Sequence, residues 1–265
     1  MVFESIVKSG DHPAFVRLLA FGFVAPIASG ITSYVLFKPW AGIAALFLCM
    51  IILIPALYSI LTTEEKITEH IDTESVFIGE YGHVLVGLMG MFIGLTAGYF
   101  LMFVSLSGEL QSLLFSVQQT DLHALNGQLI GGDAFFQIVQ NNFRVLGITV
   151  LLSLFYGIGA VHVMVWNSAL IATSMGNFFV EYLGHPAQGV LFSITRYFAH
   201  GLPEIAAYVV AGLAGSILSI AIMKHQFRSE EWWRVVKSSA QLFGISGGLV
   251  IIAALIEVFI TPWLY

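Results

Sequence analysis

The sequence has very little charge. Only 10% of its 265 residues are Asp, Glu, Lys or Arg, and 58% are hydrophobic, whereas soluble domains are typically about 25% charged. A chain this poor in charge does not suit a water-soluble domain. The composition therefore predicts an integral membrane protein whose main surroundings are the lipid bilayer.

Basic residues and cysteine are scarce as well. Ten Lys and Arg stand against sixteen Asp and Glu, which gives a net charge of -6. The chain therefore lacks the basic surface that nucleic-acid binding requires. Cys49 is the one cysteine of the sequence. These absences exclude nucleic acid as a partner and any intrachain disulfide.

Common catalytic motifs are also missing. The sequence holds no HExxH, no GxSxG, no P-loop and no GxGxxG before a helix, the patterns of metalloproteases, hydrolases and nucleotide-binding proteins. An enzyme is therefore the less favoured class for this chain.

Long apolar stretches dominate instead. A helix needs about 20 apolar residues to cross a hydrocarbon core about 30 Å thick. Five windows are clearly long enough, namely 15–37, 40–62, 83–106, 143–165 and 238–261, and a sixth is 203–223. Residues 167–183 and 187–200 are shorter and more polar, as in half-helices or a re-entrant pair. The predicted fold is an all-α, polytopic transmembrane helical bundle of six to seven spans, with short broken or re-entrant helices near 167–203.

The positions of Lys and Arg predict the topology, because short cytoplasmic loops carry an excess of positive charge. Four of these residues crowd 224–237, one lies in 63–82, and none occurs in 107–142. We therefore expect a multi-pass protein of the cell membrane, with a cytoplasmic amino terminus and residues 107–142 outside.

We expect one transmembrane domain, 1–265, with three parts. Residues 1–106 form an amino-terminal three-span part, and 143–265 form the core. Between them, 107–142 is expected to be an extramembrane segment with amphipathic helices, because apolar residues recur at helical spacing. These residues are Leu110, Leu113, Leu114 and Val117, and then Phe135, Val139 and Phe143.

Small residues at helical spacing predict close contacts between helices, because they let two backbones approach. One ridge consists of Gly90, Gly94 and Gly98, and a second consists of Ala211, Gly212, Gly215, Ser216 and Ser219. The ridges predict packing within the chain or a homodimer interface.

Ionisable and amide side chains gather in the second half of the chain. Each is costly in hydrocarbon unless it is paired or hydrated, so each marks a candidate functional site. The group consists of His162, Asn167, Glu181, Arg196, His200 and Glu204, with Glu257 further along. Gly201 and Pro203 interrupt the backbone within it.

His200 and Glu204 form the proposed middle of this polar centre. They are four residues apart, so on a helix they share a face and can reach one cation. Three alternatives follow: a structural His–Glu or Arg–Glu pair, a bound metal such as zinc or another divalent cation, and a proton or ion pathway. In a zinc site, His162, Glu181 or water are candidates for the further ligands.

The order of these residues resembles the stage II sporulation protein M family. The sequence Asn141-Asn142-Phe143-Arg144 opens a glycine-bearing span, Asn167 follows that span, and His200-Gly201-x-x-Glu204 leads into a small-residue helix. Ser168 stands where the family usually has glycine. The resemblance implies that Asn142, Asn167, His200, Gly201 and Glu204 are motif residues. It also implies a polytopic membrane protein that, in spore-forming bacteria, works in a membrane complex with cell-wall hydrolases.

Three functions are consistent with these features. The first is a non-enzymatic membrane scaffold or assembly protein, acting as a homodimer or with other membrane or cell-envelope proteins. The second is a transporter or channel for an ion or small solute that uses broken helices near 184–203. The third is an intramembrane metalloenzyme in which Glu204 acts as a base beside a metal-bound water.

Overall fold

Helices make up almost all of the described chain. The computed structural model describes residues 13–68, 77–126, 134–155, 158–181, 186–224 and 229–261, and these ranges contain no strand. The helices are α2 (Pro13–Phe37), the short 3-10 helix η1 (Lys38–Trp40), α3 (Ala41–Thr68), α4 (Phe77–Ser105), α5 (Gly108–Leu114), α6 (Ser116–Asn126), α7 (Ala134–Ser153), α8 (Ile158–Glu181), α9 (Pro186–Lys224) and α10 (Glu230–Phe259).

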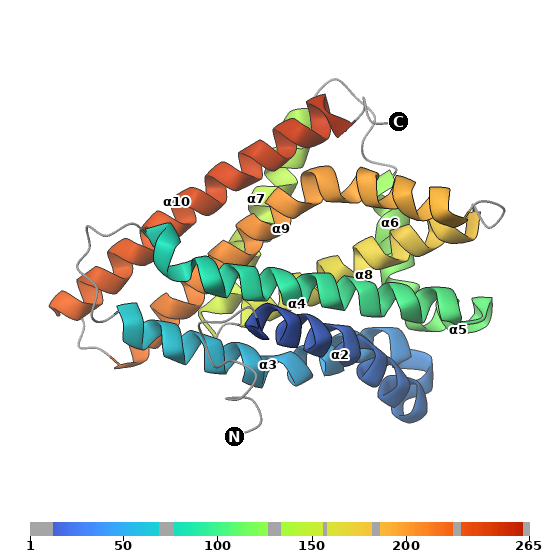
Figure 1. The fold of residues 1–265 in the computed structure, drawn as a ribbon, viewed down its shortest axis with the longest axis horizontal. Helices are drawn as coiled ribbons and strands as arrows, with labels where there is room; N and C mark the ends of the chain where they lie inside the picture. Colours follow the sequence, from blue (N-terminus) through green and yellow to red (C-terminus); the bar gives the residue numbers. More distant parts are fainter. Residues whose placement is uncertain are drawn as a thin grey trace.

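Six segments of the described chain are long and apolar enough to cross a membrane. They are Phe15–Leu57, Val84–Ser105, Phe135–Ser153, Ile158–Glu181, Gly201–Ser219 and Glu230–Phe259. The first of them folds into two helices, α2 and α3, which pack side by side (Figure 1). The prediction of an all-α, multi-pass membrane bundle of six to seven spans is confirmed.

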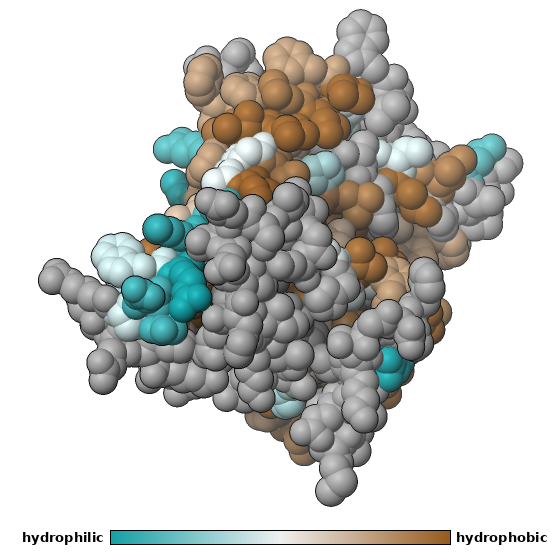
Figure 2. Space-filling view, turned by 60° about the vertical axis from the view of Figure 1, so that its left-hand side comes forward, coloured by the Kyte–Doolittle hydropathy of each residue, from teal (hydrophilic) through white to brown (hydrophobic). Residues whose placement is uncertain are grey.

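Apolar side chains also cover much of the outside of the bundle. Figure 2 shows them spread over a broad part of the described surface, and they include Trp40, Phe136 and Phe155, each more than 65% exposed. A soluble domain rarely exposes apolar patches of this extent. The hydrocarbon of a bilayer is the solvent that fits such a surface.

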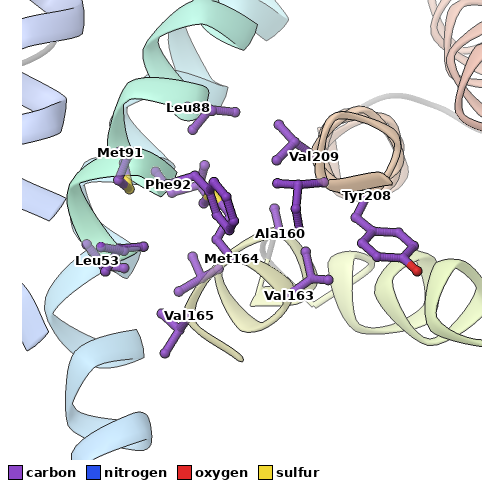
Figure 3. Packing of buried hydrophobic residues seen from close by; sticks show 14 of the residues in the cluster. Leu53, Leu88, Met91, Phe92, Ala160, Val163, Met164, Val165, Tyr208 and Val209 are labelled. Carbon is purple, nitrogen blue, oxygen red and sulfur yellow. The ribbon is translucent and has the colours of Figure 1, made fainter. Parts of the chain in front are cut away.

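The core joins the two halves of the chain. Leu53 of α3 and Met91 of α4 pack in the same buried cluster as Met164 of α8 and Val209 of α9 (Figure 3). The amino-terminal and carboxyl-terminal helices therefore bury one continuous apolar core, which stabilises them together.

The first glycine ridge packs α4 against α2. A Cβ atom added to Gly94 would collide with the carbonyl oxygen of Leu19, and one added to Gly98 would collide with that of Phe23. A Cβ atom added to Gly90 would lie 2.7 Å from the ring of Phe15. Because partners on both helices advance by four residues, α2 and α4 run parallel. The ridge is used for packing within the chain, one of its two predicted roles.

The second ridge packs α9 against α7 and α8. A Cβ on Gly212 would lie 2.5 Å from the Cβ of Ala160, and one on Gly215 would lie 2.7 Å from the Cβ of Ser153. This ridge too is occupied by contacts within the chain.

The predicted span 143–165 is wrong, because the structure divides it between two helices. Helix α7 ends at Ser153 and α8 begins at Ile158. A Cβ on Gly159 would collide with the carbonyl oxygen of Thr149, so the chain turns back closely on itself. The hydroxyl of Ser219 in α9 donates to the carbonyl of Leu154 at 2.6 Å. That bond satisfies a backbone acceptor left free at the end of α7. Hydropathy cannot detect a turn within an apolar stretch.

The expected half-helices near 167–203 are also wrong. Helix α8 continues without a break from Ile158 to Glu181, and α9 is a single helix of 39 residues, about 58 Å long. Pro203 lies inside α9, and Figure 1 shows that this helix is bent. A proline removes one backbone hydrogen bond and kinks a helix without having to end it. Within the described ranges 158–181 and 186–224, the broken helices of the transporter hypothesis are therefore not found.

The segment 107–142 divides differently from the prediction. Helices α5 and α6 cover its first part, and α6 packs against α8. The amides of Gln119 and Asn177 join these two helices by a reciprocal pair of hydrogen bonds of 3.1 and 3.2 Å. Phe135 and Val139, in contrast, belong to the span Phe135–Ser153, so they do not form a separate surface helix.

Candidate functional site

The described part of the predicted polar centre is built on a hydrogen bond within α9. The hydroxyl of Tyr208 donates to Oε1 of Glu204 at 2.9 Å. The two residues are one helical turn apart, so their side chains lie on the same face. Tyr208 is buried and Glu204 is half-buried. Figure 3 shows the Tyr208 hydroxyl pointing away from the apolar residues of α4 and α8.

A second carboxyl group approaches from α10. Glu257 lies close enough to Glu204 and to Tyr208 for its charge to act on both. It is half-buried near the end of α10. Two acidic side chains that are 53 positions apart in the sequence therefore lie within electrostatic range of each other.

Helix α7 contributes an amide to the same region, as its register with α9 shows. Ser153 of α7 contacts Gly215 of α9, and the two helices run parallel, because the next contact along both is that of Leu154 with Ser219. Asn142 precedes Ser153 by eleven residues, as Glu204 precedes Gly215. Eleven residues are three turns, so both steps keep the same face. Asn142 therefore faces the part of α9 that carries Glu204.

Contacts through α10 support this register independently. The hydroxyl of Ser246 donates to the carbonyl of Ala207 at 2.7 Å. The neighbouring Gly247 faces the ring of Phe143, which lies 3.8 Å from the position of its missing Cβ. Asn142 comes directly before Phe143 in the chain, and Tyr208 comes directly after Ala207. Both residues therefore lie at the level of these contacts. Figure 1 shows α7, the carboxyl-terminal half of α9 and α10 side by side.

Asn142 is a buried amide without a complete set of partners. Only 3% of the residue is exposed. Its Oδ1 accepts a long hydrogen bond of 3.5 Å from the amide of Asn141, and its Nδ2 has no partner in the described part of the chain. A buried donor in this state is costly, and it indicates that a further group belongs beside it.

Asn167 reaches the same level of the bundle on α8. Ala160 contacts Gly212, and α8 and α9 are consecutive, packed helices that run antiparallel in Figure 1. This register places Asn167 opposite Ile205. Its Nδ2 donates to the carbonyl of Val163 at 2.8 Å, so the amide is bonded within its own helix and its Oδ1 is left to accept.

The structure separates the other two expected metal ligands. His162 and Glu181 are 19 residues apart on the continuous helix α8, which is about 28 Å. They cannot bind the same ion. The ring of His162 lies 5.8 Å from that of Trp166, and Glu181 is exposed at the end of α8. Among the described residues, no three His, Cys, Asp or Glu side chains form a group that could hold a metal.

The side chains of Arg196 and His200 lie outside the described residues. Their backbones belong to α9, so His200 precedes Glu204 by one turn, as the sequence predicted for a continuous helix. Gly201 is buried, and Pro203 is half-buried at the bend. The predicted pairing of His200 with Glu204 stays a prediction.

Two residues of the centre were missed by sequence reasoning. Tyr208 is four residues after Glu204, and this spacing could have suggested the hydrogen bond. Ser246 gave no such signal, because its contact depends on how α10 packs. The carboxyl group of Glu204, the hydroxyl group of Tyr208 and the amide of Asn142 are groups that can exchange hydrogen bonds with a water or with one another.

Comparisons with known proteins identify one family. A family model described as Stage II sporulation protein M matches residues 43–262. No curated protein and no solved structure matches the chain significantly. The matched range includes every residue of the polar centre described above.

Proposed function

Because the chain belongs to the stage II sporulation protein M family, we propose that it is a membrane scaffold that assembles other membrane or cell-envelope proteins. The observation that carries the proposal is the convergence of Asn142, Asn167 and Glu204 at one level of the bundle. These are residues on which the sequence resemblance rests, and they come from three different helices. A centre shared by three helices supports a role in fixing their relative positions.

Polar contacts suit this role for a physical reason. Between helices in a membrane, apolar side chains gain little by leaving lipid, so packing and hydrogen bonds set the arrangement. The bond from Ser246 to Ala207 and the bond from Ser219 to Leu154 are contacts of this kind. A bundle fixed in this way presents a constant surface to its partners.

The orientation of the scaffold is part of the proposal. We place it in the cell membrane with a cytoplasmic amino terminus, on the basis of the Lys and Arg distribution. The parallel arrangement of α2 and α4 is consistent with this orientation, because it lets both helices start on the same side. Homodimer formation is a further proposal within the scaffold function.

Co-purification tests the scaffold function. The full chain and its Glu204→Gln variant are expressed in native membranes, cross-linked and purified in detergent. We expect the natural chain to bring down a reproducible set of envelope proteins and the variant to lose them while staying folded. Glu181→Gln is the matched control, because it removes an exposed carboxylate at the end of α8. Retention of all partners by Glu204→Gln would contradict the proposed role of the centre.

Two further measurements address the other hypotheses. Ion or solute flux in proteoliposomes that disappears in Glu204→Gln, while the fold survives, would replace the scaffold with a transporter. Elemental analysis of the natural chain beside His200→Ala and Glu204→Ala tests the metal. A stoichiometric zinc ion lost in both variants would show that His200 and Glu204 bind it, and metal-free protein would remove the metalloenzyme hypothesis.

A further inference from the structure

We propose that the outward face of α7 is a docking surface for a transmembrane helix of a partner protein that carries a carboxylate near the middle of the membrane. Four polar residues form this surface, which we call the polar stripe. They are Gln137, Gln140, Asn141 and Arg144. The inference rests on the proposed scaffold function and deepens it, because it names a surface of the scaffold and the chemistry of a partner.

Helical spacing and exposure define the polar stripe. Its members follow one another at steps of three, one and three residues, so they lie on one face of α7. All four side chains are exposed. Asn142, in contrast, is buried and faces α9. Helix α7 therefore directs one amide into the bundle and the polar stripe out of it.

Arg144 lies at the middle of its membrane span. The span is Phe135–Ser153, and Arg144 is nine residues from either end, which is about 14 Å along the helix. The headgroups beyond these ends are farther away than an arginine side chain extends. The exposed guanidinium of Arg144 therefore lies at a depth where an unpaired charge is costly.

Helix α10 runs antiparallel to α9, and therefore to α7. Ser246 bonds to Ala207. Ala207 lies 17 residues before the end of α9 at Lys224, and Ser246 lies 16 residues after the start of α10 at Glu230. A contact at equal distances from the connection is that of an antiparallel helical hairpin. Because α7 is parallel to α9, its level along α10 can be read from one contact.

The outside of α10 shows what surrounds the polar stripe. Phe143 contacts Gly247, so residues that follow Gly247 on α10 lie level with residues that precede Phe143 on α7. Ile251 and Ile252 reach the level of Gln140 in this way, and both are exposed. Exposed isoleucines suit the hydrocarbon of a bilayer. The polar stripe therefore lies at the depth of the hydrocarbon, although its side chains are polar.

The charge of Arg144 identifies the kind of partner. Within the described part of the chain, Arg144 has neither a carboxylate partner nor a hydrogen bond. A guanidinium pairs best with a carboxylate, to which it can donate two parallel hydrogen bonds. The three amides of the stripe can exchange hydrogen bonds with the same partner helix, as polar residues do between membrane helices.

A second copy of the chain does not fit the polar stripe. Two copies with the same orientation in the membrane hold Arg144 at the same depth. A two-fold dimer through this face would place the two guanidinium groups opposite each other, and like charges repel strongly in hydrocarbon. Charge complementarity therefore favours a different protein with an Asp or Glu in its helix.

A synthetic helix tests this chemistry. The probe is a labelled polyleucine transmembrane peptide with one glutamate at its centre, and energy transfer measures its association with the labelled full chain in liposomes. We expect the chain to bind this peptide at least about tenfold more tightly than peptides with glutamine or leucine at that position. Arg144→Leu should lose the preference, and Arg144→Lys should keep most of it. Lys237→Leu, which removes an exposed cation of α10, is the matched control.

Photo-cross-linking in native membranes tests the surface itself. A benzophenone amino acid replaces Gln140 in the full chain, and in a matched control it replaces Ile251 at the same depth on α10. We expect position 140 to form an adduct with another membrane protein, and Arg144→Leu to abolish it. Position 251 should form no adduct that depends on Arg144. Mass spectrometry of the adduct should identify a transmembrane helix that contains Asp or Glu.

Four results would overturn the inference. They are equal affinity of the chain for the three peptides, a preference for glutamate that survives in folded Arg144→Leu, an adduct between two copies of the chain, and an adduct with lipid alone. Circular dichroism and size-exclusion chromatography check that Arg144→Leu is folded, as expected for a substitution at an exposed side chain.

Failure of this inference differs from failure of the scaffold function. The scaffold is tested by the co-purification of partners with the natural chain and their loss in Glu204→Gln. If those partners are found but Arg144→Leu retains all of them, the scaffold stands without this docking surface. If the natural chain co-purifies no protein, the scaffold function fails, whatever the peptides show.

Discussion

Tyr208 donates its hydroxyl proton to Glu204 across one turn of α9, at 2.9 Å. The ring of Tyr208 is buried in the core that α9 shares with α8. One side chain thus connects the apolar core with the polar centre. The position of Glu204 therefore depends on how well the core is packed, and the centre can be tested through Tyr208 without altering a carboxyl group.

Removing that hydroxyl should destabilise the bundle. Tyr208→Phe keeps the ring but leaves Glu204 without its donor, so we expect a loss of about 1–3 kcal/mol in the free energy of unfolding. In a Glu204→Gln background the same substitution should cost less, because the charged acceptor is gone. Thermal unfolding in detergent measures both. Tyr34→Phe, at an exposed tyrosine of α2, serves as the control. Equal losses in the two backgrounds would show that the bond contributes little.

The contact between α2 and α4 should not tolerate a single methyl group. In Gly94→Ala the added Cβ meets the backbone of Leu19, which cannot move as a side chain can. We expect a loss of about 1–3 kcal/mol. Gly244→Ala is the matched control, because nothing lies within 4 Å of its added Cβ. It should be neutral or stabilising by up to about 1 kcal/mol. Unfolding curves that shift equally for both variants would contradict the packing of the ridge.

The reciprocal amide pair should hold α6 on α8. Asn177→Ala removes both hydrogen bonds to Gln119 at once, and each exposed bond contributes at most about 1 kcal/mol. We expect faster hydrogen exchange in Ser116–Asn126, with α9 unchanged. The double variant with Gln119→Ala should exchange no faster than either single one. Gln137→Ala, at an exposed amide of α7, should have no effect. Additive effects of the two substitutions would mean that the pair is not coupled.

The contact of α10 with α9 should depend on the size of residue 246. Ser246 is fully buried and bonds to the carbonyl of Ala207. Ser246→Ala loses that bond, which should cost about 1 kcal/mol. Ser246→Leu also forces the helices apart, and the larger loss of about 2–4 kcal/mol combines the bond with overpacking. Intramolecular cross-linking between cysteines placed on α9 and α10 reports the separation. If the two variants had the same stability and the same cross-linking, residue 246 would not lie at the contact between α9 and α10.

The class of the protein could be read from composition, because the cost of exposing charge to hydrocarbon limits what a membrane chain can contain. The boundaries of the membrane spans were harder to predict from the sequence. A run of apolar residues such as 143–165 has the same hydropathy whether it crosses the membrane as one helix or is divided between α7, which ends at Ser153, and α8, which begins at Ile158. The turn was decided by Gly159, which lets α8 start against the end of α7.

The polar centre also combines features that the sequence predicted with features that only the structure revealed. From the sequence alone came the membrane class, the two small-residue ridges and the choice of Glu204 as a candidate residue, since these depend on residue type and on spacing along one helix. Only the tertiary structure placed Asn142 on the face of α7 toward Glu204, brought Glu257 within electrostatic range of Glu204, and moved His162 and Glu181 apart. Distances between helices depend on which faces pack and in which register, and no local pattern encodes that register. Contacts such as Ser153 with Gly215 and Ser246 with Ala207 determine it.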